Sequence, residues 1–160
     1  MKLPRLLFLV FFLLFAPAIS AGESIRPFVA GSLAKILAEH QGKPFVLAFW
    51  SVTCAYCPTE LKALGKIRKS HPKLDVVLVA ADTQEDAPLA AEMVASFGLG
   101  KVEQWIFADD MPERLRFEID QRWHGELPRT HFYDRDHRVK VVSGVVPPQR
   151  LADWVKANVQ

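Results

Sequence analysis

The sequence predicts an α/β fold in which helices flank both faces of a mixed central β-sheet. Apolar runs of strand length at residues 45–50 and 74–81 alternate with segments of helical periodicity. A hairpin pattern and a last helical segment then end the chain. The run 45–50 is apolar throughout, which is typical of a strand whose sheet is covered on both faces. This order of elements predicts a sheet between two layers of helices.

The first half contains two helices and the first two strands. Residues 32–40 form a short amphipathic helix that Ser32 is expected to cap. A Gly-Lys-Pro turn leads into strand 45–50, and helix 58–70 follows. Pro58 suits the first turn of that helix, where no N–H group is needed. The second strand comes next, at residues 74–81.

The second half is predicted in the same way. A helix at 87–97 ends at Gly98 and Gly100. A short strand at 104–108 precedes a helix at 112–118, which Asp109 and Asp110 are expected to cap. Strands 129–134 and 139–143 form an antiparallel hairpin, and helix 148–159 closes the chain.

The N-terminus has the pattern of a secretory signal. Lys2 and Arg5 precede an apolar run at 6–16 and small residues up to position 21. We expect residues 1–21 to be a signal peptide, cleaved after Ala18, Ser20 or Ala21, with one domain at 22–160. A retained anchor is the alternative, but the run is shorter than the ~20 residues that span a bilayer. The domain is exported in either case.

The charge of the mature chain excludes some partners. Loss of Lys2 and Arg5 brings the 20 basic residues to 18, equal to the 18 acidic ones. A formally neutral domain is not expected to bind nucleic acid or anionic membranes in general.

The chain has two cysteines, Cys54 and Cys57, where the first strand passes into a helix. The N-terminal end of a helix favours a thiolate over a thiol. A second cysteine one turn later can attack a mixed disulfide that the first one makes. The pair therefore predicts reversible dithiol–disulfide chemistry, with Cys54 as nucleophile and Cys57 as resolving thiol.

Two other roles for the cysteines are weaker. A structural bridge across two residues closes a small loop and stabilises a domain of this size little. Zinc needs two more ligands at a workable spacing. No second Cys pair exists, and the five histidines supply no suitable couple near the first. We therefore predict no metal site and no organic cofactor, and only a redox-active disulfide.

Residues 49–60, with sequence FWSVTCAYCPTE, resemble the active-site segment of the TlpA/ResA/DsbE-like thioredoxins. These are exported, often membrane-tethered thiol–disulfide oxidoreductases of bacteria. Residues 127–136, LPRTHFYDRD, are similar to the second hallmark of that group, a proline before a strand that ends in Asp. With WIFAD at 105–109 the likeness covers approximately residues 30–158.

The resemblance implies a thioredoxin fold and roles for several residues. Pro128 is expected to be a cis-proline that packs against the disulfide and leaves the backbone of Leu127 free to pair with a substrate. An ordinary trans-proline at the start of a strand is the alternative. Glu60 matches an acidic residue that relays protons or tunes the pKa values of the cysteines. Its alternative role is only a favourable interaction with the helix dipole.

The chain departs from the group at the cysteines. Thr53 replaces the usual Trp, and Ala55 and Tyr56 separate the two cysteines. Tyr56 offers a flat surface to a partner polypeptide, or merely shields the disulfide. Further substrate contacts are predicted at Thr53, Leu127, Trp123 and Trp50, the last as a core residue with its ring edge near the site.

The resemblance also implies location and partners. We expect a periplasmic monomer that reduces disulfides in other exported proteins, apocytochrome c among the candidates. A membrane thiol transporter of the DsbD/CcdA type would supply its electrons. The sequence leaves open an oxidase or isomerase, because direction depends on the relative stability of the two redox states. It also leaves open a metallochaperone or adaptor that holds Cu(I).

Overall fold

The computed structural model describes residues 25–159. The predicted signal peptide and its cleavage sites lie outside the described residues. The described part contains a six-stranded sheet in the order β1-β4-β3-β2-β5-β6. The strands are β1 (Arg26–Phe28), β2 (Phe45–Trp50), β3 (Asp75–Ala80), β4 (Glu103–Phe107), β5 (Arg129–Tyr133) and β6 (Val139–Ser143). Strands β1, β4, β3 and β2 are parallel, and β5 and β6 are antiparallel to their neighbours.

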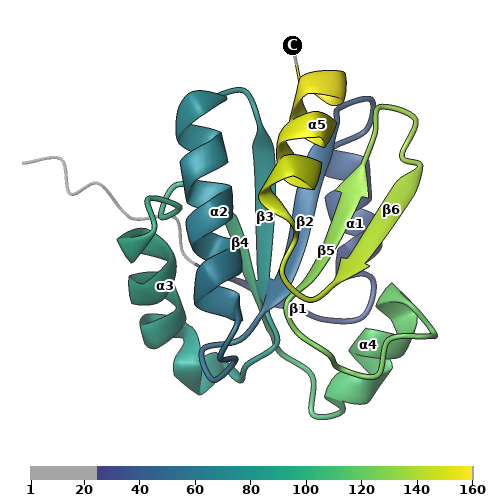
Figure 1. Ribbon diagram of the computed structural model, residues 1–160. Coiled ribbons are helices and arrows are strands. Elements are labelled where there is room, and N and C mark those ends of the chain that lie inside the picture. The colour runs from purple at the N-terminus through teal and green to yellow at the C-terminus, as the bar shows by residue number, and fades with distance from the viewer. Residues whose placement is uncertain (1–24, 160) are drawn as a thin grey trace, which may run out of the picture.

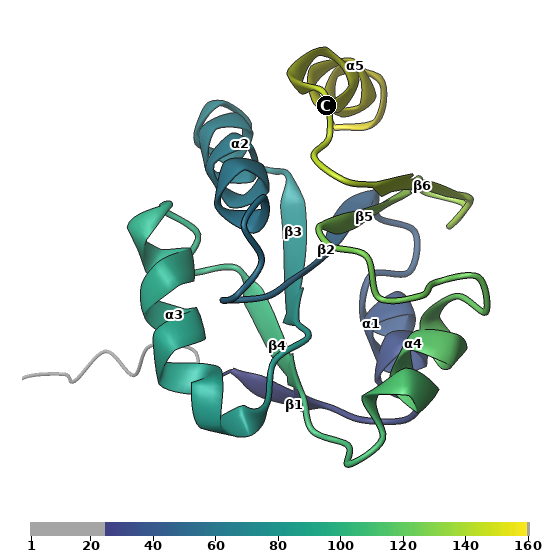
Figure 2. The same cartoon turned by 60° about the horizontal axis from the view of Figure 1, so that its bottom comes forward.

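Five α-helices cover the two faces of the sheet (Figures 1 and 2). They are α1 (Ser32–Glu39), α2 (Cys57–Ser70), α3 (Ala87–Ser96), α4 (Pro112–Ile119) and α5 (Pro148–Asn158). Figure 2 shows α2, α3 and α5 on one face and α1 and α4 on the other. The mixed sheet with helices on both faces is the predicted fold class, which is confirmed.

Alternation along β2 explains the two layers. Val46, Ala48 and Trp50 pack into the core beneath α2, α3 and α5. Phe45, Leu47 and Phe49 pack into the second core, beneath α1 and α4. Successive side chains of a strand point to opposite faces, so an apolar strand serves both cores.

Two elements were not predicted, and two predicted helix caps were wrong. Strand β1 was missed, and Gln84–Asp86 form a short 3₁₀ helix before α3. Gly31, with φ 83°, stands at the N-cap of α1, and Ser32 Oγ instead accepts a hydrogen bond from the Val29 N–H (2.9 Å). Met111 is the N-cap of α4, because Asp109 forms a turn in which its Oδ1 accepts from the Met111 N–H (2.9 Å).

Gly65 marks a close approach between α2 and the end of α3. A Cβ atom there would lie 2.1 Å from the backbone oxygen of Phe97. Alanine improves helix propensity by about 1 kcal/mol, but the backbone of α3 would have to move. We expect Gly65→Ala to lower the free energy of unfolding by about 1–3 kcal/mol in urea denaturation. The exposed Lys66→Ala is the control, and equal stability of both variants would contradict this account.

Candidate active site

The two cysteines lie between β2 and α2 and form a disulfide, with Cα atoms 5.4 Å apart. Cys54 sits in the turn before the helix, where its N–H donates to the Ser51 oxygen (3.2 Å). Cys57 is the first residue of α2 and is fully buried, whereas Cys54 is half-buried. The accessible sulfur therefore belongs to Cys54, just ahead of the helix end that favours an anion.

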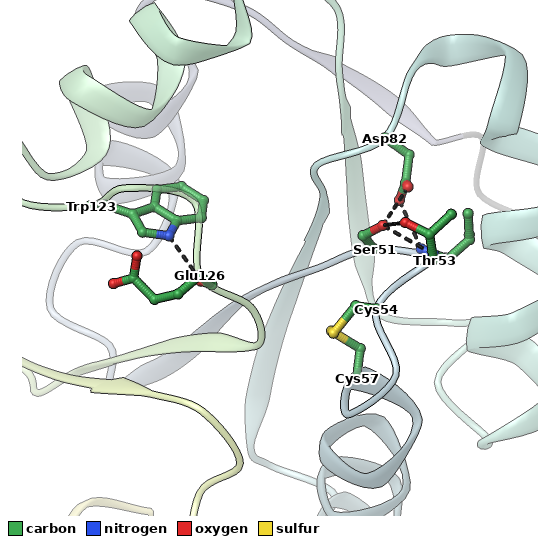
Figure 3. Close-up of a disulfide and its surroundings, with 8 residues drawn as sticks. Ser51, Thr53, Cys54, Cys57, Asp82, Trp123 and Glu126 are labelled. Carbon is green, nitrogen blue, oxygen red and sulfur yellow. Dashed lines mark hydrogen bonds between the residues drawn. A yellow bond between two sulfur atoms is a disulfide. The ribbon is translucent and has the colours of Figure 1, made fainter.

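Asp82 holds the turn in front of Cys54. It follows β3, which lies beside β2, and its two carboxylate oxygens accept from Ser51 Oγ (2.6 Å) and from the Val52 N–H (3.0 Å). Ser51 Oγ also accepts from the Thr53 N–H (3.1 Å). Figure 3 shows this cluster on one side of the disulfide. Sequence reasoning missed Asp82, although a polar residue directly after a buried strand beside the cysteine-bearing strand was an available signal.

The start of β5 lies at the same end of the sheet as the cysteines. Phe49 pairs with Arg129 in the antiparallel register of β2 and β5, so Pro128 comes next to the end of β2. The peptide bond between Leu127 and Pro128 is cis, as predicted. Leu127 and Cys54 both pack against the core cluster that contains Cys57. The two motifs, far apart in the sequence, therefore lie at the same end of the sheet.

Glu60 is a buried carboxylate one turn after Cys57 on α2, with 1% of its surface exposed. Its Oε1 accepts from Thr130 Oγ1 (3.1 Å), and its Oε2 accepts from the Val146 N–H (2.8 Å). Burial raises the pKa of Glu60 above its ordinary value, although both hydrogen bonds oppose this. Glu60 thus connects α2 to β5 and to the segment before α5, which is more than an interaction with the helix dipole, and its role in proton transfer stays a prediction.

The five predicted substrate contacts divide into two groups. Thr53 and Tyr56 are exposed, Tyr56 by 69%, and Leu127 is half-buried. The other two, Trp50 and Trp123, are buried, and the core position predicted for Trp50 is confirmed. Trp50 is 2% exposed because β2 is covered on both faces, and Trp123 is 4% exposed because its indole N–H donates inward to the Glu126 oxygen (2.9 Å). Neither indole offers a surface to a substrate.

Arg129, directly after Pro128, is the centre of a buried polar cluster that sequence reasoning missed. Its guanidinium donates to Asp120, to Glu126 Oε1 (2.9 Å) and to Ser143 Oγ (2.8 Å). Its Nε donates to His131 Nε2 (3.3 Å). An arginine inside a predicted strand was the available signal, since a charge that the sheet buries requires partners.

His131 lies in this cluster on β5 and is buried. Burial and the charge of Arg129 lower the pKa of His131 from 6.5 to about 4, whereas Asp120 acts in the opposite sense. Because the unfolded chain takes up this proton at higher pH, the contribution of His131 to stability is present above pH 6.5 and is lost as the pH falls toward 4.

We expect wild-type protein to lose about 3 kcal/mol of unfolding free energy through His131 over that range. His131→Gln keeps an acceptor for Arg129 and should flatten the curve of stability against pH, measured by urea denaturation between pH 4 and 7. His124→Gln, at an exposed histidine, is the matched control. A curve for His131→Gln that parallels the wild type would rule this assignment out.

The described range, residues 25–159, contains neither a metal-binding cluster nor a membrane-spanning helix. No cluster of three or more His, Cys, Asp or Glu side chains in this range is arranged to hold a metal ion. No helix in this range has the length and apolar character needed to cross a membrane.

Several solved structures have a similar fold. A secreted Mycobacterium tuberculosis disulfide oxidoreductase homologous to Escherichia coli DsbE is 24% identical, with a TM-score of 0.59, and the match covers 75% of this chain and 85% of that one. DsbF from the same organism is 27% identical, with a TM-score of 0.56 and coverage of 74% and 83%. A thioredoxin-family thiol:disulfide interchange protein of Chlorobium tepidum is 17% identical, with a TM-score of 0.61 and coverage of 78% and 85%.

Sequence comparison assigns the family. No curated protein matches the chain, but the AhpC/TSA family matches residues 32–148, which is most of its length. The structural neighbours are thiol–disulfide oxidoreductases of the DsbE and DsbF type. With the disulfide at the start of α2 and a cis-proline directly before β5, the chain belongs to the AhpC/TSA family and has the fold of a thioredoxin-like thiol–disulfide oxidoreductase.

Proposed function

We propose that this protein reduces disulfides in other exported proteins through its Cys54–Cys57 pair. The observation that carries the proposal is the asymmetry of the disulfide, with Cys54 half-exposed at the start of α2 and Cys57 buried behind it. The two roles in disulfide exchange differ in the same way, since the attacking thiol has to reach a partner and the resolving thiol only has to reach its neighbour.

The reaction consists of two exchanges. In the first, the Cys54 thiolate attacks one sulfur of a substrate disulfide, so that a mixed disulfide forms and the other substrate sulfur leaves as a thiolate. In the second, Cys57 loses its proton and attacks the sulfur of Cys54. The Cys54–Cys57 disulfide forms, the second substrate thiol leaves, and two electrons have passed to the substrate. Glu60, one turn after Cys57, is the proposed acceptor of the Cys57 proton.

The surroundings of the disulfide suit a polypeptide substrate. Tyr56 exposes 69% of its surface beside Cys54, and Thr53 is exposed on the other side. Leu127 precedes the cis-proline, where its backbone would pair with an extended substrate segment. An external dithiol has to reduce the protein again, and a membrane thiol transporter of the DsbD/CcdA type fits the proposed periplasmic location. Apocytochrome c is a candidate substrate. No organic cofactor or metal takes part in this scheme.

Insulin reduction with dithiothreitol as electron donor tests the proposal. The protein should accelerate insulin precipitation, and the double variant Cys54→Ser, Cys57→Ser should not. Equilibration of the pair with glutathione then gives the direction of electron flow that its potential favours. A strongly oxidising pair would favour an oxidase or isomerase. Stoichiometric Cu(I) binding without turnover would contradict the enzyme and support a metallochaperone.

A further inference from the structure

The segment between α4 and β5 carries Leu127 and Pro128, yet residues 120–128 contain no helix or strand. One of its hydrogen bonds reaches the sheet region, where the Pro128 oxygen accepts from the Gly144 N–H after β6 (2.8 Å), and the backbone bonds of residues 120–126 are local. The Trp123 N–H donates to the Asp120 oxygen (2.8 Å), and the His124 N–H donates to Glu126 Oε2 (3.1 Å). Figure 3 shows Trp123 and Glu126 on this segment, across from the disulfide. Trp123 also packs on Phe49 of β2, with ring centres 4.9 Å apart. The polar side chains of residues 120–126 have a further contact with the sheet.

Arg129 makes that contact from the sheet. It is the first residue of β5, and it pairs with both neighbouring strands. Its guanidinium reaches Asp120 at the beginning of the segment and Glu126 (2.9 Å) near its end. The guanidinium carbon also lies 5.7 Å from the centre of the Trp123 ring. One buried side chain thus contacts the beginning, the middle and the end of the segment.

The chemistry of the guanidinium suits this task. Its planar fork can donate to several acceptors at once in fixed directions, which a lysine cannot do. Only 6% of the Arg129 side chain is exposed, so water does not compete for these hydrogen bonds. Ser143 on β6 completes the cluster, since its hydroxyl accepts from Arg129 (2.8 Å) and donates to Glu126 (3.1 Å).

We propose that Arg129 is a positioning residue for substrate binding, whose guanidinium fastens residues 120–126 to β5 and so sets where Leu127 and Pro128 stand beside the disulfide. The proposal rests on the proposed function, because it concerns the binding of a polypeptide disulfide. Arg129 neither touches the cysteines nor takes part in sulfur exchange. Its loss should impair the docking of a polypeptide and leave the disulfide chemistry itself unchanged.

Two reactions of the same protein separate these effects. Insulin has to dock beside Leu127 before Cys54 attacks it, whereas dithiothreitol reaches Cys54 as a small molecule. For Arg129→Met we expect the KM for insulin to rise by about 10-fold or more, since a small displacement of a positioning group can cost up to ~100-fold. The rate of reduction of the Cys54–Cys57 disulfide by dithiothreitol and its equilibrium with glutathione should stay at wild-type values.

Arg138→Met is the matched control, because it removes one positive charge at the exposed hairpin, where Arg138 pairs with Asp134 and Asp136. It should keep the wild-type KM. If Arg129→Met does not fold, Glu126→Gln and Glu126→Ala decide, since glutamine keeps an acceptor for Arg129 and alanine does not. The KM for insulin should be near the wild-type value in Glu126→Gln and raised in Glu126→Ala.

Three results would overturn the proposal. An unchanged KM for insulin in Arg129→Met or Glu126→Ala would show that the cluster does not position the segment. An equal loss of the insulin and dithiothreitol reactions would show a general structural role. If the wild-type protein does not reduce insulin, the proposed function fails and this inference fails with it. If the wild type reduces insulin and the variants have an unchanged KM, only the inference is contradicted.

Discussion

Cys57→Ser is expected to trap mixed disulfides between Cys54 and polypeptide substrates, and to abolish catalytic reduction of insulin. The half-exposed Cys54 sulfur can still attack, but the variant has no thiol to displace the product. Cys54→Ser should be equally inactive without trapping any partner, because Cys57 is fully buried at the start of α2. The mixed disulfides can be detected on non-reducing gels and identified by mass spectrometry of the linked peptides.

Ser70→Ala is a matched control for this pair of variants. Ser70 is the exposed last residue of α2, at the opposite end of the helix from Cys57, and its loss leaves both sulfur atoms in place, so turnover should remain and no partner should be trapped. The opposite pattern, with adducts in Cys54→Ser and none in Cys57→Ser, would reverse the assignment of nucleophile and resolving thiol.

The central part of the fold could be predicted because its signals are local. Strand β2 is apolar at each of its six residues, and Pro58 marks the start of the helix that follows it. The hairpin of β5 and β6 has a polar turn between two strand patterns. Strand β1 could not be predicted in this way. It has three residues, Arg26–Phe28, too few to show a period, and it exists as a strand because β4 pairs with it.

The site could be predicted as far as its motifs extend. The cysteine pair, Pro128 and Glu60 stand at positions that a family resemblance identifies, and the structure brings them to one end of the sheet. The partners of Arg129 were not accessible from sequence. Asp120, Glu126 and Ser143 converge only after α4 has packed on the sheet and β6 has paired with β5, and single-sequence patterns do not contain that geometry.

The burial of Trp50 and Trp123 has a related cause. Trp123 is near the second motif in sequence, which made it a candidate for the rim of a substrate groove, whereas Trp50 was expected in the core with only its ring edge near the site. Which face a strand residue takes depends on register, and Trp50 falls on the face beneath α2. Trp123 packs against Phe49 on the opposite face, with ring centres 4.9 Å apart. Proximity to a motif therefore did not predict exposure.

Because successive residues of β5 point to opposite faces of the sheet, the strand makes polar contacts on both faces. Arg129 points toward the α4 side and holds the segment before Pro128. Thr130 points toward α2 and donates to Glu60 (3.1 Å). The strand that follows the cis-proline is thus connected through Glu60 to the helix that begins with Cys57.

Glu60→Gln is expected to slow the second exchange and leave the first unchanged. Glutamine can accept from the Val146 N–H and donate to Thr130 Oγ1, so the connections of Glu60 remain. It cannot take the proton of Cys57, and loss of a general base typically costs about 100-fold or more. Rapid-mixing kinetics should therefore show the mixed disulfide accumulating in Glu60→Gln during a single turnover, with wild-type formation and slow resolution.

The pH dependence gives the sharper test. Because burial raises the pKa of Glu60, the folded wild type loses stability as the pH rises from the ordinary value of 4.5 through the raised one. Because glutamine does not ionise, Glu60→Gln should not show this loss of stability. The rate at which the mixed disulfide is resolved should also lose the pH dependence that comes from ionisation of Glu60. Glu60→Ala, by contrast, leaves the buried Val146 N–H without its acceptor and should cost about 1–3 kcal/mol of stability. If Glu60→Gln resolves the mixed disulfide at the wild-type rate and with the wild-type pH profile, Glu60 is only a structural connection between α2 and β5.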